Sequence, residues 1–136
     1  MIVCITGAPG TGKTWLGEAL SLTSGTALVR TDDLIPLGWS EASQAVAARL
    51  LTAREDLIVE GVAVPRALRK ALDQADERPC DRLVLLRARR AERGVASPGE
   101  LVMAKGLLTV LHQIFAELVE RGVEVVDRDG VAIQRL

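Results

Sequence analysis

A glycine-rich run near the N-terminus has the residue types and spacing needed to bind phosphate. Residues 7–14, GAPGTGKT, match the pattern GxxxxGK[ST] at every position and lie between an apolar run and a helix-like segment. Glycine lacks a Cβ atom, so the backbone can wrap closely around a phosphate, and the following helix adds its positive dipole end. We therefore expect nucleotide phosphates to bind to Gly7, Ala8, Pro9, Gly10, Thr11, Gly12, Lys13 and Thr14.

Two side chains of this loop would take part in the chemistry. The Lys13 ammonium would lie on the β- and γ-phosphates of ATP, and the Thr14 hydroxyl would be a ligand of Mg²⁺. The alternative interpretation is a glycine-rich turn that binds no ligand, and a complete motif between a strand and a helix argues against it. A loop that binds a nucleotide without turning it over fits the same residues.

Acidic side chains follow two of the strand-like runs. Asp32 and Asp33 come directly after the run Ala27–Arg30, and Glu60 ends the run Leu57–Glu60. The carboxyl ends of parallel strands open onto one crevice, so these carboxylates are expected to face the γ-phosphate. We predict that Asp32, rather than Asp33, accepts the proton of an acceptor hydroxyl, and that Glu60 holds Mg²⁺ through water. An acidic turn and an ordinary strand-end glutamate are the alternative interpretations.

A basic segment with a single opposing carboxylate follows the fourth strand-like run: Arg87, Arg89, Arg90, Glu92 and Arg93. Guanidinium groups on a segment that closes over a nucleotide stabilise charge on the phosphate oxygens, and excluding water strengthens each contact. We predict a short lid around residues 88–99, with Arg89 and Arg93 as catalytic residues. For any single arginine, a solvated basic turn is the alternative.

Alternating strand-like and helix-like segments would position these residues. The expected strands are Met1–Thr6, Ala27–Arg30, Leu57–Glu60, Leu83–Leu86 and Val123–Val126. The expected helices are Lys13–Leu22, Ser40–Ala53 with Ser40 as N-cap, Pro65–Ala75 and Pro98–Arg121. This alternation predicts an α/β fold, a parallel sheet with helices on both faces in three layers. The tail Val131–Leu136 is expected to be an edge strand or a frayed end.

Apolar spacing predicts which face of each helix packs against the sheet. The first helix would bury Trp15, Leu16, Ala19 and Leu20. The last and longest helix would bury Leu101, Leu108, Leu111, Phe115 and Leu118.

Composition limits the classes of function. Half of the residues are hydrophobic (49%), the net charge is −1 and aromatic residues make up 2%, so the core must be aliphatic and general polyanion binding is disfavoured. Cys4 and Cys80 form no metal-binding pattern. The apolar start is too short to span a bilayer and lacks a basic n-region, so we expect a cytoplasmic protein without membrane attachment.

The residues together resemble the P-loop kinases of small molecules, nucleotides and polynucleotide ends. The family's order is matched by GAPGTGKT, the TDDLI after the second strand, the LIVEG of the third and the arginines after the fourth. The resemblance covers nearly the whole chain, and only the first motif is highly specific. It implies one kinase domain over residues 1–136, a five-stranded parallel sheet in the order 2-3-1-4-5, a lid over ATP and Asp32 as base. Ile35 departs from it, because polynucleotide kinases usually carry an arginine there.

The sequence therefore predicts an ATP-dependent kinase that transfers the γ-phosphoryl group to a hydroxyl acceptor. The acceptor would be a small molecule, a nucleotide, or a polynucleotide end or hydroxymethylated base in DNA. The alternative from another class is a non-catalytic or weakly hydrolytic nucleotide-binding regulatory module. Trp39, Arg66 and Arg69 are candidates for acceptor contacts, although Trp39 would equally cap the core and the arginines would equally face solvent.

Overall fold

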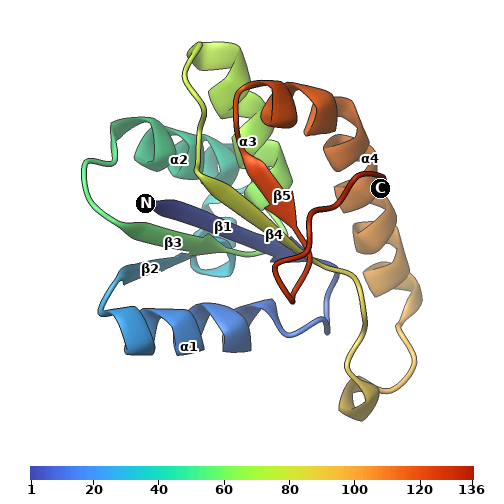
Figure 1. Ribbon diagram of the computed structural model, residues 1–136. Helices are drawn as coiled ribbons and strands as arrows, with labels where there is room; N and C mark the ends of the chain where they lie inside the picture. Colours follow the sequence, from blue (N-terminus) through green and yellow to red (C-terminus); the bar gives the residue numbers. More distant parts are fainter.

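Five short parallel strands form a single sheet in the computed structural model, which describes residues 1–136 (Figure 1). The strands are β1 (Ile2–Gly7), β2 (Ala27–Arg30), β3 (Leu57–Glu60), β4 (Arg82–Leu86) and β5 (Glu124–Val126). Their order across the sheet is β2-β3-β1-β4-β5, as the family resemblance implied. β1 therefore lies in the middle, with β3 on one side and β4 on the other.

The strand register brings the carboxyl ends of the central strands together. Glu60, the last residue of β3, pairs with Ile5 of β1 and with Arg30, the last residue of β2. On the other side of β1, Gly7 pairs with Leu86, the last residue of β4. The loops that follow these four strands therefore start at one edge of the sheet.

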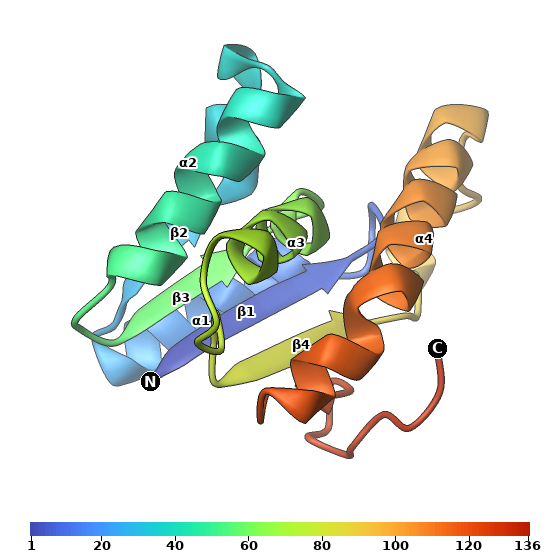
Figure 2. The same ribbon diagram turned by 90° about the horizontal axis from the view of Figure 1, so that it is seen from above.

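Four helices cover the two faces of the sheet unequally (Figure 2). They are α1 (Lys13–Ser24), α2 (Trp39–Thr52), α3 (Val64–Gln74) and α4 (Pro98–Glu120). α1 packs against β1, β2 and β3 on one face, while α2, α3 and α4 lie together on the other. The three predicted layers are confirmed, with one helix on one side and three on the other.

Each face of the sheet has its own aliphatic core. The larger core, between the sheet and α2–α4, holds 18 buried residues, among them Cys4 and Leu118. The smaller one, under α1, holds Ile5, Ile58, Val84, Leu86 and Val126. Neither cluster of buried residues contains an aromatic side chain, as the composition predicted.

The start of α2 differs from the prediction. α2 begins at Trp39 and its N-cap is Gly38, so the prediction of Ser40 as N-cap is wrong. Gly38 has a φ of 106°, which lets the chain turn into the helix before Ser40 is reached. Ser40 instead accepts hydrogen bonds from Lys70 Nζ through its carbonyl oxygen (2.8 Å) and its hydroxyl oxygen (3.1 Å). The residues before Gly38, Thr31–Leu37, form a 3-10 helix that the sequence did not suggest.

The prediction for α1 is correct in part, because Leu16 packs against the smaller core, but the buried face is rotated away from the rest of the predicted stripe. Trp15 is 54% exposed and Leu20 is exposed as well, whereas Lys13 and Gly17 are buried. The reason is the close approach of α1 to β3: a Cβ at Gly17 would lie 3.1 Å from the Glu60 side chain. Only a helix face without a bulky side chain fits at that point, so the indole of Trp15 lies outside the core.

The prediction for α4 is correct at some positions and wrong at others. α4 begins with a capping box, in which the Ser97 hydroxyl accepts from the Glu100 N–H (3.2 Å) and the Glu100 carboxylate accepts from the Ser97 N–H (3.0 Å). Leu101 and Leu108, predicted to be buried, are exposed. The buried stripe consists of Leu107, Val110, Leu111, Ile114 and Leu118.

The last helix and the C-terminal tail each have one further feature. α4 is long and apolar enough to cross a membrane by length and composition alone, a test that core helices of soluble proteins also pass. In this fold it packs against α3 and β5. The C-terminal tail forms no full strand, and a single antiparallel bridge joins Ala132 to Val126.

Candidate active site

The loop between β1 and α1 has the backbone conformation of an anion-binding cradle. Gly10 and Gly12 have positive φ angles of 85° and 89°, which other residues rarely adopt. No hydrogen bond within the protein uses the backbone N–H of Gly10, Thr11 or Gly12. The first turn of α1 adds further N–H groups at the positive end of the helix dipole. These donors are suited to phosphate oxygens.

Lys13 is the first residue of α1 and its side chain is almost fully enclosed, with 8% exposure. Its ammonium lies 3.4 Å from the carbonyl oxygen of Ala8. Burial lowers the pKa of Lys13, and the nearby carboxylates of Asp32 and Glu60 counteract part of that shift. An anion bound next to the ammonium would further favour the charged form of Lys13.

Glu60 is buried at the end of β3, with 1% exposure. Its Oε1 accepts a hydrogen bond from Thr14 Oγ1 (3.3 Å), and its Oε2 has no partner. Burial, and then the charge of Asp32, raises the pKa of Glu60. Arg30 only partly neutralises this carboxylate, because its Nε lies 3.8 Å from Oε1. Glu60 therefore retains capacity for a further cation or donor.

Gly61 keeps the segment that carries Asp32 close to the end of β3. Its φ is 144°, and a Cβ at this position would overlap the Thr31 hydroxyl. The Gly61 carbonyl accepts a hydrogen bond from Thr6 Oγ1 (2.9 Å), which ties the same point to β1. The ends of β1, β2 and β3 are thus held together next to residues 7–14, here called the phosphate loop after their predicted role.

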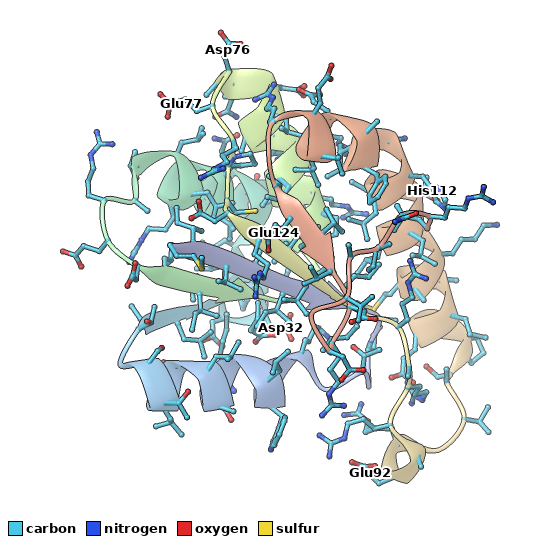
Figure 3. All side chains as sticks on the ribbon, viewed as in Figure 1. Asp32, Asp76, Glu77, Glu92, His112 and Glu124 are labelled. Carbon is cyan, nitrogen blue, oxygen red and sulfur yellow. The ribbon has the colours of Figure 1, made fainter.

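Asp32 lies on the wall of a cavity of about 500 Å³, here called the central cavity. The phosphate loop forms one wall of this cavity through Pro9 and Gly10, and Lys13 and Thr14 line it as well. Figure 3 shows Glu92 at the tip of the segment between β4 and α4, away from Asp32. Asp32 and Asp33 are both exposed, and only Asp32 lines the cavity.

The two predicted catalytic arginines lie in different environments. Arg93 lines the central cavity, and its guanidinium lies 3.8 Å from Glu100. Arg89 does not line the cavity, because it donates hydrogen bonds to the carbonyls of Pro9 (2.8 Å) and Gly94 (2.8 Å). Its guanidinium also lies 3.3 Å from Glu100. Arg89 thus joins the segment before α4 to the phosphate loop, while Arg93 faces the space beside it.

Glu100 connects this segment to the start of α4. The N–H of Ser97, and then the guanidinium of Arg89, hold the pKa of Glu100 below its ordinary value. A main-chain hydrogen bond from Arg90 N to the Gly10 carbonyl (2.8 Å) adds a second link to the phosphate loop. A hollow of about 410 Å³, lined by Arg90 among others, adjoins the central cavity at Gly10, Lys13, Thr14 and Arg93.

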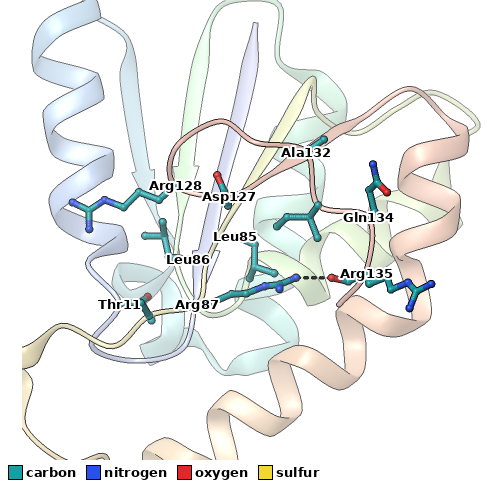
Figure 4. Close-up of a pocket in the computed structure, with 11 residues that line it drawn as sticks. Thr11, Leu85, Leu86, Arg87, Asp127, Arg128, Ala132, Gln134 and Arg135 are labelled. Carbon is teal, nitrogen blue, oxygen red and sulfur yellow. Dashed lines mark hydrogen bonds between the residues drawn. The ribbon is translucent and has the colours of Figure 1, made fainter.

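A further cavity, missed by the sequence reasoning, lies where β4 and β5 end (Figure 4). It measures about 430 Å³ and is lined by Thr11 of the phosphate loop, the residues after β4 and those after β5. Arg87 Nη2 donates to the Arg135 carbonyl across its edge (2.8 Å). The rule that ligands bind beyond the carboxyl ends of parallel strands would have indicated this place, but not its side chains.

The three candidate acceptor residues have different surroundings. The guanidinium carbon of Arg66 lies 5.3 Å from the centre of the Trp39 ring system, and Trp39 also lines the central cavity. Arg69 instead donates to the Gln113 side chain on α4 (2.8 Å). Trp39 and Arg66 therefore lie beside the cavity, and Arg69 is engaged between two helices.

Comparison with known proteins shows similarity at the level of the fold. No protein-family model matches the sequence, and no curated protein matches it. A shikimate kinase from Acinetobacter baumannii, solved in complex with shikimate, is similar with a TM-score of 0.55 and 15% sequence identity, over 92% of this chain and 81% of that chain. A crystal structure of an uncharacterized protein from Eubacterium ventriosum gives a TM-score of 0.50 and 12% identity, over 94% and 88% of the two chains. This chain has a three-layer α/β fold similar to that of the shikimate kinase.

Proposed function

We propose that this chain is an ATP-dependent kinase that transfers the γ-phosphoryl group to a hydroxyl of a small molecule. The observation that carries the proposal is the central cavity, in which Lys13, Thr14, Asp32 and Arg93 line one space next to the phosphate loop. A cation for the phosphates, a carboxylate for the acceptor proton and a guanidinium for the transferring charge are the groups that phosphoryl transfer requires.

The nucleotide would bind with its phosphates on the loop and its base in the cavity beyond β4 and β5. Thr11 lines that cavity and belongs to the phosphate loop, so one ligand can reach both. The volume of about 430 Å³ is adequate for a nucleobase with part of its sugar. The segments after β4 and β5 would therefore contribute to nucleotide binding, in addition to residues 7–14.

The residues around Thr14 fit Mg²⁺ when it arrives with a nucleotide. The Thr14 hydroxyl and the Glu60 carboxylate are hard oxygen donors, and Glu60 Oε2 is buried without a partner. No group of three or more His, Cys, Asp or Glu side chains could hold a metal by itself. The ion would complete its coordination with water and phosphate oxygens, as Mg²⁺ usually does, and would supply charge neutralisation at the phosphates.

In the proposed reaction, the acceptor oxygen attacks the γ-phosphorus and forms a new P–O bond. The bond between the γ-phosphorus and the bridging oxygen breaks, and ADP leaves with that oxygen. Asp32 accepts the proton of the acceptor hydroxyl. Lys13 and Arg93 stabilise the negative charge on the phosphoryl oxygens, and residues 88–99, held to the loop through Arg89, would act as the lid that excludes water.

Transfer from labelled ATP to a panel of acceptors tests the proposal. The panel contains sugars, nucleosides, aminocyclitols, shikimate, aryl and alkyl alcohols, and DNA with free 5′-hydroxyl or hydroxymethyl groups. We expect label on a small-molecule alcohol, with DNA unlabelled. ADP that binds tightly while no acceptor gains label would contradict the proposal and favour the regulatory nucleotide-binding module.

Asp32→Asn tests the role of the base directly. The amide cannot accept the proton, so kcat for acceptor phosphorylation should fall about 10²- to 10⁴-fold while ATP binding remains. Asp33→Asn is the matched control, because Asp33 is the neighbouring aspartate and does not line the central cavity. Equal activity of the Asp32 variant and the control would remove Asp32 from the mechanism.

A further inference from the structure

A second cavity adjoins the central cavity on the side away from the phosphate loop. It measures about 310 Å³ and lies between the starts of α2 and α3 and the first half of α4. Three residues line both cavities: Trp39, Val62 and Met103. A ligand in the central cavity can therefore extend into this second space, here called the apolar cavity.

The two adjoining cavities differ in chemistry. Six of the nine residues around the apolar cavity are hydrophobic, and Arg66 is its only charged residue. The central cavity instead contains Lys13, Asp32, Arg93 and Glu100. A ligand that spans both would place a polar, reacting end among the charges and an apolar end between α2 and α4.

Trp39 forms the wall at the junction. Trp39 is 40% exposed, so part of this residue is available for contact with a ligand. The Arg66 guanidinium lies over the ring, 5.3 Å from its centre, and forms no ion pair with a carboxylate. This cation–π contact helps to hold the indole at the wall of the apolar cavity, which Arg66 also lines.

Gly106 lies within α4 at the wall of the apolar cavity. Glycine is a poor helix former, and Gly106 lies inside α4 without a positive φ angle that would require a glycine. A Cβ built at Gly106 would meet no atom within 4 Å, so close packing does not demand a glycine either. Its effect is to keep open the space between α4 and Trp39.

We propose that the acceptor is a small alcohol with an apolar ring or alkyl chain, whose hydroxyl lies at Asp32 and whose apolar body fills the space between Trp39, Met103 and Gly106. This inference rests on the proposed kinase function and names its substrate class. Sugars and other polyols fit less well, because hydroxyls buried against apolar walls lose their hydrogen bonds to water. A nucleic acid fits less well too, since the apolar cavity holds a single cation.

Binding can be measured without any phosphoryl transfer. Trp15→Phe leaves Trp39 as the only tryptophan, so its fluorescence reports on the apolar cavity. We expect 3-phenylpropan-1-ol to saturate the signal at a concentration at least tenfold below that of glycerol or ribose. Equal affinity for these probes, or tighter binding of the polyols, would overturn the inference.

Gly106→Leu narrows the cavity and should weaken 3-phenylpropan-1-ol binding by about tenfold or more. Ala116→Leu is the matched control, because it adds a side chain of the same size at an exposed position of the same helix, and it should bind as the parent does. Gly106→Ala adds one methyl group in open space, so it preserves folding and should give a smaller loss in the same direction. Unchanged binding in both Gly106 variants would contradict the inference.

Transfer of label from ATP separates this inference from the proposed function. Phosphorylated polyols together with no preference for the aryl alcohol would overturn the acceptor class and leave the kinase function standing. Selective binding of 3-phenylpropan-1-ol to the cavity, with no acceptor of any class phosphorylated, would overturn the kinase function and leave the apolar binding site standing. Selective binding followed by transfer to the aryl alcohol supports both.

Discussion

The loop wall of the central cavity, formed by Pro9, Gly10, Lys13 and Thr14, comes from one short stretch of chain, whereas the wall beside Trp39 is assembled from distant segments. On the phosphate side, the groups offered are backbone N–H donors and the Lys13 ammonium. On the Trp39 side, the groups are apolar side chains from the start of α2, the segment before α3 and the first half of α4. The two sides adjoin, yet one is polar and local and the other is apolar and assembled by packing.

This difference indicates a division of labour within the proposed kinase. Phosphates are alike in every nucleotide, so a contiguous loop with a fixed backbone conformation suffices to bind them. Acceptors differ in size and polarity, and side chains on separate helices can vary independently to suit them. Changes on the phosphate side should therefore affect transfer to every acceptor, and changes on the Trp39 side should affect selectivity.

Lys13→Ala should have the largest effect. Removing the ammonium from the phosphates is expected to lower kcat by about 10²- to 10³-fold for every acceptor, measured as ADP release in a coupled assay. Lys105→Ala is the control, because Lys105 is exposed on α4. A loss confined to one class of acceptor would break the distinction between the two sides.

Trp39→Ala should have an intermediate effect, and on a different parameter. Truncating the indole removes apolar contact from the acceptor and is expected to raise KM for an aryl alcohol about tenfold, with a much smaller change for glycerol. Steady-state kinetics with both alcohols measures the ratio. An equal change in KM for the two would show that Trp39 does not select the acceptor.

Ser97→Ala should have the smallest effect, and on stability. Losing the N-cap of α4 is expected to lower the free energy of unfolding by about 1 kcal/mol, measured by urea denaturation. Thr109→Ala on the exposed face of α4 should stay within about 0.5 kcal/mol of the parent. If the Ser97 variant were as stable as the parent, the capping box would not help to hold the Glu100 end of α4 in place.

The fold followed from the sequence to a large extent. The alternation of apolar runs and helix-like segments located all five strands and four helices, because apolar runs and 3.6-residue patterns are local properties. Their order across the sheet came from the resemblance and is confirmed. The 3-10 helix Thr31–Leu37 and the early start of α2 at Trp39 were missed, since the turn at Gly38 depends on its tertiary setting.

The packed faces of the helices were predicted less well. Trp15 and Leu101 look like core residues by spacing, yet both are exposed. A small rotation of a helix moves an apolar side chain from the core to the surface, and neighbouring elements set that rotation. At α1, for example, Gly17 has to lie against Glu60.

The sequence alone predicted the phosphate loop and its positive-φ glycines, because its proposed function depends on the conformation of consecutive backbone atoms and on residues that permit it. Only the tertiary structure decided which residues meet across the cavity: that Arg93 faces the cavity while Arg89 joins the segment before α4 to the loop, and that Trp39 and Gly106 line one apolar space. These meetings depend on how α2, α3 and α4 pack on the sheet. Side chains far apart in the chain come together through that packing, which the pattern of neighbouring residues does not predict.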